Sequence, residues 1–444
     1  MKRIVCVVLT LIIVIGAVSC SGGDIPPSVE LGMPTGNETM PSAAEPGDPP
    51  GDGAALSEIA PGTQTDGPLG DDTATSATTP GTQPDEGAEA PKPGSEAQQD
   101  EGAEATDETK APGEIEVVAP PRFGFIDTHA DTITRALLPH NNANLYRNKL
   151  HVDFERLLEF DAPVQVFVLW CADSYVSNAF EYTNSLIDFF EKEVAKHSDI
   201  IEIALTPEDL ARNYRNKKIS AILSIEGGEA LMGNIENVEH FYGRGVRIMA
   251  LTWNRENELG FGQATGSKEG LKPFGIEVLK KMEELGIMLD ISHINEAGFW
   301  DAHRHSTRPY MASHSNAYSV TPHDRNLKDN QIKAMVERGG VIGLVLYPLI
   351  LSQGSSADIS DIMAHVGHFI DIGAGGNLGL GGDLDGFGTM PKGFTCVLSY
   401  KILEKAIADE YGKETARRIM SGNTYDFFLR YYSQSAAHAP ARGN

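Results

Sequence analysis

The chain has 444 residues and a formal net charge of −26, from 62 acidic and 36 basic residues. It contains no cluster of basic residues suited to nucleic acid, so we expect no nucleic-acid partner. Residues 21–118 hold 21 of the acidic residues and only two lysines. The acidic balance is therefore mostly a property of this segment and says little about a substrate.

The N-terminus has the pattern of an export signal. Lys2 and Arg3 precede an apolar run over residues 4–18, which is shorter than the roughly 20 residues needed to cross a bilayer. We therefore predict a signal peptide over residues 1–19. The small residues before Cys20 resemble the lipobox of bacterial lipoproteins. We expect Cys20 to be lipidated and to anchor the exported protein to a membrane of the bacterial cell envelope, with a plain cleaved signal peptide as the alternative.

Residues 20–120 are dominated by Pro, Gly, Ala, Thr, Ser, Asp and Glu and contain crude repeats. Such a composition cannot bury enough apolar surface to offset the conformational entropy of the chain. We predict a disordered acidic tether that charge repulsion keeps extended. The folded domain is expected over residues 121–433, followed by a disordered tail over residues 434–444. Within the domain, Cys171 and Cys396 give no sign of whether they pair.

The domain alternates short apolar runs with longer amphipathic segments. The short runs predict eight strands, over residues 123–127, 164–171, 220–225, 246–252, 287–292, 310–313, 341–347 and 378–382. The longer segments predict helices over residues 182–198, 235–243, 270–285, 296–303, 329–338 and 359–372. Eight strands that alternate with helices are typical of an α/β fold, the (β/α)8 TIM barrel. A doubly wound open sheet is the alternative.

Polar side chains stand where the predicted strands end. In a parallel barrel the C-terminal ends of all strands meet at one face, which is where such enzymes hold their active sites. We therefore expect these residues to form one cluster. In chain order they are His129, Asp131, Glu226, Trp253, Asn254, His293, His314, Tyr347, Asp383 and Asp385.

Three histidines with two or three carboxylates suit a pair of zinc ions with one bridging carboxylate. His129 and Asp131 stand two residues apart, so on an extended strand both side chains point to the same face. Each residue alone has an ordinary structural explanation. Glu226 could cap a helix, a lone histidine is more often a core residue, and Asp383 and Asp385 could belong to a glycine turn.

Other candidate motifs are expected to lie outside the site. His365 and His368 stand one turn apart in an amphipathic segment, which indicates a helix surface or core, and His303 and His305 are predicted in a loop. The glycines of residues 260–266 lack the strand and the acidic residue of a nucleotide-binding loop. The chain has neither Gly-x-Ser-x-Gly nor His-Glu-x-x-His, which disfavours a serine hydrolase or a zincin.

The chain resembles the membrane dipeptidase (renal dipeptidase) family of zinc peptidases over residues 122–432. A His-x-Asp pair in place of His-x-His, and a glutamate bridge in place of a carboxylated lysine, separate this family from other barrel amidohydrolases. Six motifs carry the resemblance in the family's order: Asp127-Thr128-His129-Ala130-Asp131, Ile225-Glu226-Gly227-Gly228, Asp290-Ile291-Ser292-His293, Ser313-His314-Ser315-Asn316-Ala317-Tyr318-Ser319-Val320, Arg325-Asn326-Leu327 and Gly381-Gly382-Asp383-Leu384-Asp385-Gly386.

The resemblance implies a cofactor of two zinc ions in this chain. His129 and Asp131 match the ligands of one ion, and His293 and His314 match the ligands of the other. Glu226 matches the carboxylate that bridges the two ions. The resemblance also allows a homodimer.

The resemblance implies substrate contacts as well. Arg325 stands where the family binds the C-terminal carboxylate of the substrate, a role that suits a planar, permanently charged guanidinium. Asp383 stands where the family binds the free amino group and assists proton transfer, with Asp385 as the fallback. Tyr347 matches a tyrosine that lines the carboxylate pocket.

One position departs from the family pattern. Trp253 stands where mammalian members carry the histidine that polarises the scissile carbonyl. An indole N–H donates one hydrogen bond but does not titrate near neutral pH. Asn254 or a zinc ion is therefore expected to supply that contact.

The expected function is hydrolysis of dipeptides, including those with a C-terminal D-residue, by a hydroxide that bridges two zinc ions. Glu226 and Asp383 are the expected catalytic residues, and Arg325 with Asp383 would select dipeptides by holding both ends. The same metal site could instead act on N-acyl amino acids, lactones or β-lactams, an alternative that Trp253 supports. A lipid-anchored binding protein without catalysis is disfavoured because all five predicted metal ligands are present.

Overall fold

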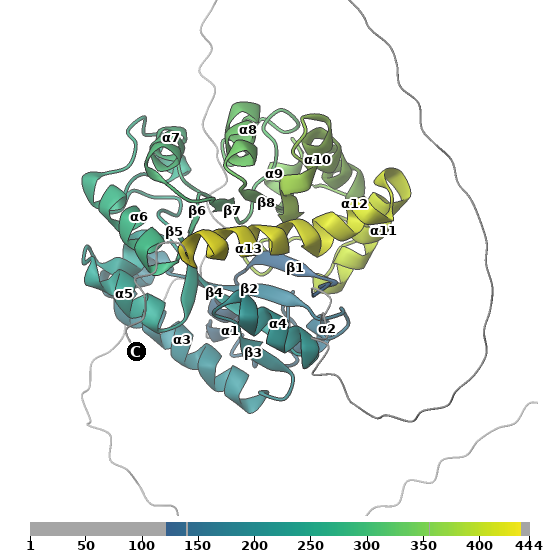
Figure 1. Ribbon diagram of the computed structural model, residues 1–444, viewed down its shortest axis with the longest axis horizontal. Helices are drawn as coiled ribbons and strands as arrows, with labels where there is room; N and C mark the ends of the chain where they lie inside the picture. The colour runs from purple at the N-terminus through teal and green to yellow at the C-terminus, as the bar shows by residue number, and fades with distance from the viewer. Residues whose placement is uncertain (1–120, 139–140, 355, 437–444) are drawn as a thin grey trace, which may run out of the picture. The chain divides into compact units, whose positions relative to one another are not determined.

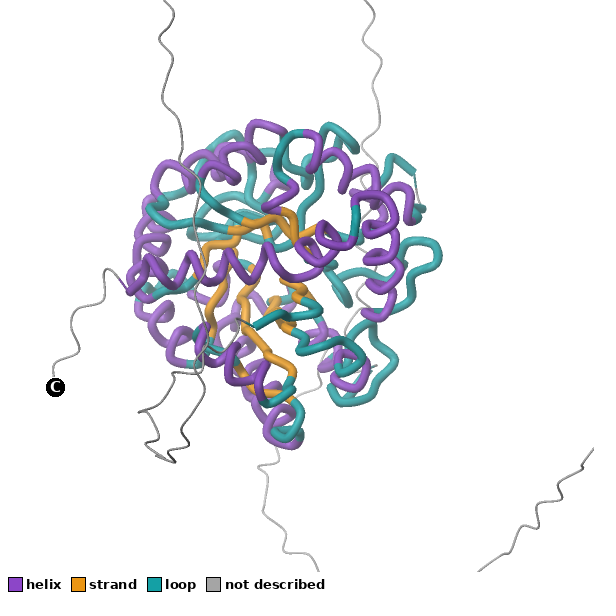
Figure 2. Tube along the Cα trace, turned by 45° about the vertical axis from the view of Figure 1, so that its right-hand side comes forward, coloured by secondary structure: helices purple, strands orange, loops and turns teal. Residues whose placement is uncertain are grey.

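The computed structural model describes residues 121–138, 141–354 and 356–436, and these residues contain nine strands whose pairings are all parallel. In Figure 2 the strands lie at the centre and the helices surround them. The strands are β1 (Ile126–Ala130), β2 (Val164–Trp170), β3 (Ile201–Ile203), β4 (Ile219–Glu226), β5 (Val246–Ala250), β6 (Met288–Asp290), β7 (Met311–Ala312), β8 (Val341–Leu344) and β9 (Leu378–Leu380).

Eight of these strands close into a barrel. β1 pairs with β2 on one side and with β9 on the other, and the series of neighbours continues from β9 through β8, β7, β6 and β5 to β4. Pairing of β2 with β4, from Val164↔Ser220 to Trp170↔Glu226, completes the ring. The closed ring confirms the (β/α)8 TIM barrel and excludes the open sheet. The three-residue strand β3 pairs with β4 at Ile201↔Ile219 and was not predicted.

Local sequence explains where the helices begin and end. α10 starts with a capping box, in which the Asp358 side chain accepts a hydrogen bond from the backbone amide of Asp361 and the Asp361 side chain accepts one from the backbone amide of Asp358. α6 ends at Gly286, which adopts a left-handed φ of 91°. The helices are α1 (Thr132–Leu137), α2 (Phe154–Leu157), α3 (Ala179–Lys196), α4 (Pro207–Arg215), α5 (Glu236–Gly243), α6 (Pro273–Leu285), α7 (Glu296–His305), α8 (Asp329–Glu337), α9 (Pro348–Leu351), α10 (Ile359–Asp371), α11 (Tyr400–Tyr411), α12 (Lys413–Arg417) and α13 (Asn423–Ala436).

Several predicted boundaries were wrong. The first strand, predicted over residues 123–127, is β1 over Ile126–Ala130, so His129 lies within it rather than after it. The strand predicted over residues 341–347 ends at Leu344, and Tyr347 is the N-cap of α9 because Pro348 can occupy the first turn of a helix. His303 and His305 lie in the last turn of α7 rather than in a loop. The six helices predicted from amphipathic periodicity are present as α3, α5, α6, α7, α8 and α10.

Two apolar cores use alternate residues of the same strands. Val164 and Val166 of β2 belong to a cluster that includes aromatic residues of α13. Phe167 and Leu169 of the same strand belong to a second cluster, together with residues of the surrounding helices. This division follows from the two-residue period of a strand, which sends neighbouring side chains to opposite faces of the barrel wall.

α13 passes across the strands in Figure 1 and covers the end of the barrel from which the strands begin. Phe427, Phe428 and Tyr431 are buried there in one cluster with Ile126, near the start of β1. The Tyr431 hydroxyl donates a hydrogen bond of 2.6 Å to the carbonyl of Ile287, just before β6. Because aromatic side chains fill this end, a substrate site has to lie at the opposite end.

The predicted signal peptide over residues 1–19, the lipidation site Cys20 and the tether over residues 20–120 lie outside the described residues and stay predictions. α13 continues to Ala436, and residues 437–444 also lie outside the described part of the chain.

Two further observations concern the described residues. None of their helices is both long and apolar enough to cross a membrane. Cys171 and Cys396 are both free thiols.

His365 is a core residue of α10. Its Nδ1 accepts a hydrogen bond from the Ala317 amide at 3.2 Å, and its Nε2–H donates to the Leu351 carbonyl at 3.0 Å. Burial lowers the pKa of His365 from 6.5 to about 4. The folded protein therefore requires the neutral ring. His368, one turn along the same helix, pairs with Asp329 at 2.8 Å.

We predict that His365 makes the protein less stable in mild acid. Its contribution is fully present above the unfolded pKa of 6.5 and is lost as the pH falls toward about 4, because only the unfolded chain binds the proton. This pKa difference corresponds to a loss on the order of 3 kcal/mol. His365→Gln should flatten the free energy of unfolding against pH in this window, whereas His305→Gln, at an exposed position, should not. Denaturant titrations across the window measure the slopes, and equal slopes in wild type and H365Q would contradict the prediction.

Candidate metal centre

The five predicted ligands converge where the barrel strands end. Among the described residues, three sets of three side chains each place their ligand atoms within 4.8 Å of one another, and all members are buried. The sets are His129, Asp131 and Glu226; Glu226, His293 and His314; and His129, Asp290 and His314. Two of the three sets consist entirely of predicted ligands.

His129 and Asp131 both direct unpartnered atoms into the site. His129 lies within β1, and Asp131 is the N-cap of α1, although its side chain makes no capping hydrogen bond. His129 Nε2 lies 3.6 Å from Asp131 Oδ2. Within the described residues, neither His129 Nε2 nor Asp131 Oδ1 has a hydrogen-bond partner, although both atoms are buried. A buried polar atom without a partner costs about 1–3 kcal/mol, so both atoms fit a bound cation.

Glu226 occupies the centre of the cluster. It is the last residue of β4 and is 5% exposed. Its Oε1 lies 3.0 Å from His293 Nε2 and 3.6 Å from both His129 Nε2 and His314 Nε2. One carboxylate oxygen therefore faces the ligands expected for both ions, which is the position that a bridging ligand requires.

His293 and His314 approach each other from neighbouring strands. His293 follows β6 and has a φ of 67°, a left-handed conformation that non-glycine residues rarely adopt. His314 follows β7, and the two Nε2 atoms lie 2.9 Å apart. Burial, together with the positive charges of Arg325 and His129, lowers the pKa of both rings well below the usual range. Both histidines are therefore neutral, which is the form that binds metal.

The centre concentrates charge that water cannot screen. Burial raises the pKa of Glu226 well above its usual range, and Asp131 adds to that rise while His129 opposes it. Burial likewise raises the pKa of Asp383 to about 8. For His129, burial lowers the pKa, but Glu226 and Asp131 outweigh that effect and raise it to about 10. In the absence of metal, Glu226, Asp383 and His129 therefore hold protons, which bound divalent cations could replace.

Arg325 and Asp383 border the cluster next to different predicted ligands. Arg325 Nη2 lies 2.8 Å from His314 Nε2, on the side of one expected ion. Asp383 Oδ1 lies 3.9 Å from His129 Nε2, on the side of the other. A Cβ at Gly386 would lie 2.1 Å from Asp383 Oδ1 and 2.7 Å from Asp131 Oδ2, so only glycine leaves room for both carboxylates.

Asp385 points away from the ligands and holds a loop. Its Oδ1 accepts a hydrogen bond from the His151 amide at 2.6 Å, and its Oδ2 accepts from the Thr132 hydroxyl at 2.6 Å and from the Val152 amide at 3.3 Å. The Asp385 amide donates to His151 Nδ1 at 3.0 Å. With these contacts made, Asp383 is the aspartate of the pair that faces the metal centre.

Trp253 and Asn254 lie beside His293. Asn254 Oδ1 lies 2.7 Å from His293 Nδ1 and accepts its N–H, which leaves Nε2 of that ring for a metal. The Trp253 ring lies 6.0 Å from the His293 ring and 5.0 Å from the ring of Trp170. Asn254 therefore orients a ligand, and its predicted contact with the substrate carbonyl stays a prediction. Tyr347 packs against Phe387 at 5.2 Å between ring centres, and its predicted substrate contact likewise stays a prediction.

A cavity of about 370 Å³ opens beside the centre. His293 and Arg325 line its inner end, and Gln263, Lys268 and Lys328 are among the polar residues that line the rest. Because Arg325 borders both the ligands and this cavity, a molecule bound to its guanidinium would have space next to the metals.

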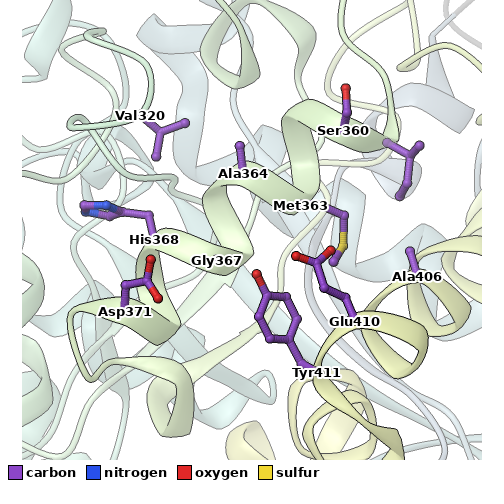
Figure 3. Close-up of a pocket in the computed structure, with 11 residues that line it drawn as sticks. Val320, Ser360, Met363, Ala364, Gly367, His368, Asp371, Ala406, Glu410 and Tyr411 are labelled. Atoms are coloured by element: carbon purple, nitrogen blue, oxygen red, sulfur yellow. The ribbon is translucent and has the colours of Figure 1, made fainter.

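A second cavity, of about 670 Å³, lies between α10 and α11. Figure 3 shows His368 and Asp371 on one side of it and Glu410 and Tyr411 on the other. It contains none of the predicted ligands. We therefore place the chemistry at the smaller cavity.

The residues behind the ligands were not singled out from the sequence. Ser313 Oγ lies 3.1 Å from His129 Nδ1 and 2.8 Å from His314 Nδ1, and it donates to Asp290 Oδ2. Asp127 accepts hydrogen bonds from the Tyr400 hydroxyl at 2.6 Å and from the His129 amide at 2.8 Å. A polar residue just before a candidate ligand was a visible signal, but only the fold shows which atoms meet.

A closed (β/α)8 barrel whose strand ends bring together three histidines and two carboxylates has the construction of a metal-dependent hydrolase. The chain belongs to the membrane dipeptidase family, peptidase family M19, whose family model matches residues 120–437. This confirms the resemblance found in the motifs. Members of this family are metallo-dipeptidases, so the protein is a metal-dependent hydrolase of the dipeptidase type.

Individual relatives agree with this assignment. An uncharacterised dipeptidase of Schizosaccharomyces pombe is 29% identical over 321 residues, which cover 64% of this chain and 75% of the relative. The solved structure of dipeptidase AC, a metallopeptidase of family M19, has a TM-score of 0.65 at 25% identity and covers 70% of this chain and 99% of its own. A Rhodobacter sphaeroides metallopeptidase, solved with a phosphinate mimic of L-Ala-D-Ala, has the same TM-score and coverage at 24% identity and supports the fold.

We predict that zinc affinity rises with pH. His129, with a pKa of about 10, is protonated near neutral pH and must lose a proton to bind metal, and the raised pKa of Glu226 acts in the same direction. Each proton released should strengthen binding by about tenfold per pH unit between about pH 6 and pH 8. Chelator competition measures the affinity, and calorimetry in buffers of different ionisation enthalpy counts the protons. An affinity that does not change with pH would contradict the prediction.

Proposed function

We propose that the protein is a two-zinc dipeptidase that cleaves the single peptide bond of a dipeptide, including dipeptides with a C-terminal D-residue. The observation that carries this proposal is that a cation, Arg325, and a carboxylate, Asp383, lie next to different histidines of the ligand cluster, His314 and His129. Two such groups can hold the carboxylate and the amino group of a zwitterionic dipeptide. The L-Ala-D-Ala mimic bound by the Rhodobacter sphaeroides metallopeptidase supports the extension to D-residues.

The donor set suits zinc, since histidine nitrogens and carboxylate oxygens are its usual ligands. Bound divalent cations lower the pKa of a coordinated water and polarise a carbonyl. His129 and Asp131 would hold one ion, His293 and His314 the other, and Glu226 would contact both.

The remaining groups position the substrate and move a proton. Arg325 offers a planar pair of N–H donors that match a carboxylate. Asp383 offers a carboxylate that can accept a hydrogen bond from the substrate amine and exchange a proton with it. Trp253 stands beside His293 and can donate an indole N–H but cannot act as an acid or base.

A substrate panel tests the proposal. The metal-free protein should be inactive, and added zinc should restore hydrolysis of L,L- and L,D-dipeptides but not of tripeptides or N-acetylated dipeptides. Preference for N-acyl amino acids, lactones or β-lactams would favour the second enzymatic candidate, for which Trp253 is the only support. A protein that binds no zinc and cleaves none of these compounds would overturn both.

The role of Arg325 is tested separately. Arg325→Met should raise the KM for a dipeptide by about 100-fold, because about 3 kcal/mol of charge-assisted hydrogen bonding to the carboxylate is lost. Arg325→Lys, the matched control, should recover part of this loss, and both variants should keep their zinc. Wild type should cleave a dipeptide amide as poorly as R325M does. Dipeptide kinetics unchanged in R325M would contradict the assignment.

A further inference from the structure

Ser313 lies behind the two expected metal sites and touches a ligand of each. It precedes His314 on the segment that follows β7 and is completely buried. Its Oγ lies 3.1 Å from His129 Nδ1 and 2.8 Å from His314 Nδ1. Its hydroxyl also bonds Asp290, the last residue of β6. A single oxygen thus contacts four buried groups, the fourth being the more distant Ser292 Oγ at 3.3 Å.

The Asp290 carboxylate sets the direction of these hydrogen bonds. Its Oδ1 accepts from the amides of Ser292 at 2.9 Å and Ser313 at 2.8 Å, and its Oδ2 accepts from the Ser313 hydroxyl, since a carboxylate can only accept. A hydroxyl has one proton and two lone pairs, and the lone pairs face the two imidazoles at 2.8 and 3.1 Å, which are closer than Ser292 Oγ at 3.3 Å. Each ring must therefore present an N–H at Nδ1.

We propose that Ser313, held by Asp290, is the positioning residue that keeps the Nδ1 proton on both His129 and His314, so that each ring offers Nε2 to its own metal ion. The inference rests on the proposed two-metal function, because it takes these histidines as ligands. Asn254 does the same for His293, whose Nδ1 lies 2.7 Å from Asn254 Oδ1.

The Nε2 atoms of His293 and His314, the ligands expected for one ion, converge on one point. With their Nδ1 protons in place, His293 and His314 direct Nε2 lone pairs at each other across 2.9 Å, and Glu226 Oε1 lies 3.0 Å from the first of them. Lone pairs this close repel one another unless a cation lies between them. Arg325, at 2.8 Å from His314 Nε2, supplies positive charge at this point.

The same residues admit a different explanation, which the structure disfavours. His129, Asp290 and His314 could together hold a metal ion by their distances alone. The Oγ of Ser313 contacts all three, so it occupies the space that such an ion would need. A third ion is therefore an outcome to be tested rather than our proposal.

Two variants separate hydrogen-bond direction from packing. Ser313→Ala removes the shared oxygen. Asp290→Asn keeps the side-chain volume, but its oxygen stays on the two backbone amides and its NH2 must donate to Ser313. The Ser313 hydroxyl then has to donate to one imidazole, whose proton moves to Nε2. Ser292→Ala is the control, because Ser292 Oγ is the most distant hydrogen-bond partner of Ser313 Oγ, at 3.3 Å, and otherwise accepts the His314 amide at 3.2 Å.

The experiment uses the zinc-loaded full chain. Chelator competition should show that S313A and D290N each weaken zinc binding by about 10- to 100-fold, the usual effect of losing a group that orients a metal ligand, whereas S292A changes it by less than about twofold. Long-range 1H–15N NMR should show protonated Nδ1 on His129 and His314 in wild type and a different pattern for one ring in D290N. The melting temperatures of the metal-free proteins report general loss of packing.

The outcomes are distinct. Wild-type affinity and NMR pattern in D290N would overturn the inference even if S313A failed to fold. Loss of a third zinc equivalent in S313A or D290N would overturn it in favour of a metal at Asp290. If S292A weakened zinc binding as much as S313A, the effect would be one of packing, and the inference would also fail. A wild-type protein that binds no zinc would instead overturn the proposed function itself.

Discussion

The structure depends on how one buried carboxylate is surrounded. Glu226 brings its Oε1 within 3.0–3.6 Å of three imidazole nitrogens, and two more carboxylates lie beside His129. Removing these charges from water is costly unless they are neutralised, so the barrel has to bind either protons or cations there. The raised pKa values of Glu226, Asp383 and His129 mean that these groups bind protons when no cation is present. The unpartnered atoms of His129 and Asp131 are free to bind a cation instead.

Apolar packing at the opposite end of the barrel offsets the cost of this concentration of charge. Aromatic residues of α13 fill the space where the strands begin, and the inner apolar cluster extends through Val164 and Val166. Stability is thus supplied mostly at one end and chemistry at the other, the separation usual for this fold. Asp385 and Asp383 stand two residues apart but have different roles. Asp385 holds a loop through hydrogen bonds from His151 and Thr132, and Asp383 faces the predicted metal centre.

The sequence predicted the barrel and its principal helices because apolar periodicity is a local property. It also indicated that the five predicted ligands lie at or near strand ends, where the structure brings their side chains together, since strand ends can be read from where an apolar run stops. It did not predict α13 or β3, where packing against distant segments decides the structure, and it extended β8 too far, where Pro348 begins a helix. Its preference for Asp383 over Asp385 came from the family resemblance, because the spacing of the two is the same as that of any alternate pair. The contacts of the Ser313 hydroxyl join residues up to 184 positions apart, which no local pattern encodes.

Glycines explain how one serine can reach two ligands. A Cβ at Gly343 would lie 2.0 Å from the Ser313 carbonyl, and a Cβ at Gly381 would lie 1.7 Å from it, so any larger residue would push β8 or the end of β9 away. Thr128 fixes the same approach by donating to the carbonyls of Ser313 at 2.6 Å and Leu380 at 2.8 Å. The close packing of β1, β7, β8 and β9 at this level brings the Ser313 hydroxyl between His129 and His314. The small residues of the motifs are therefore as much a part of the metal centre as its ligands, because they set the distance over which hydrogen bonds can orient them.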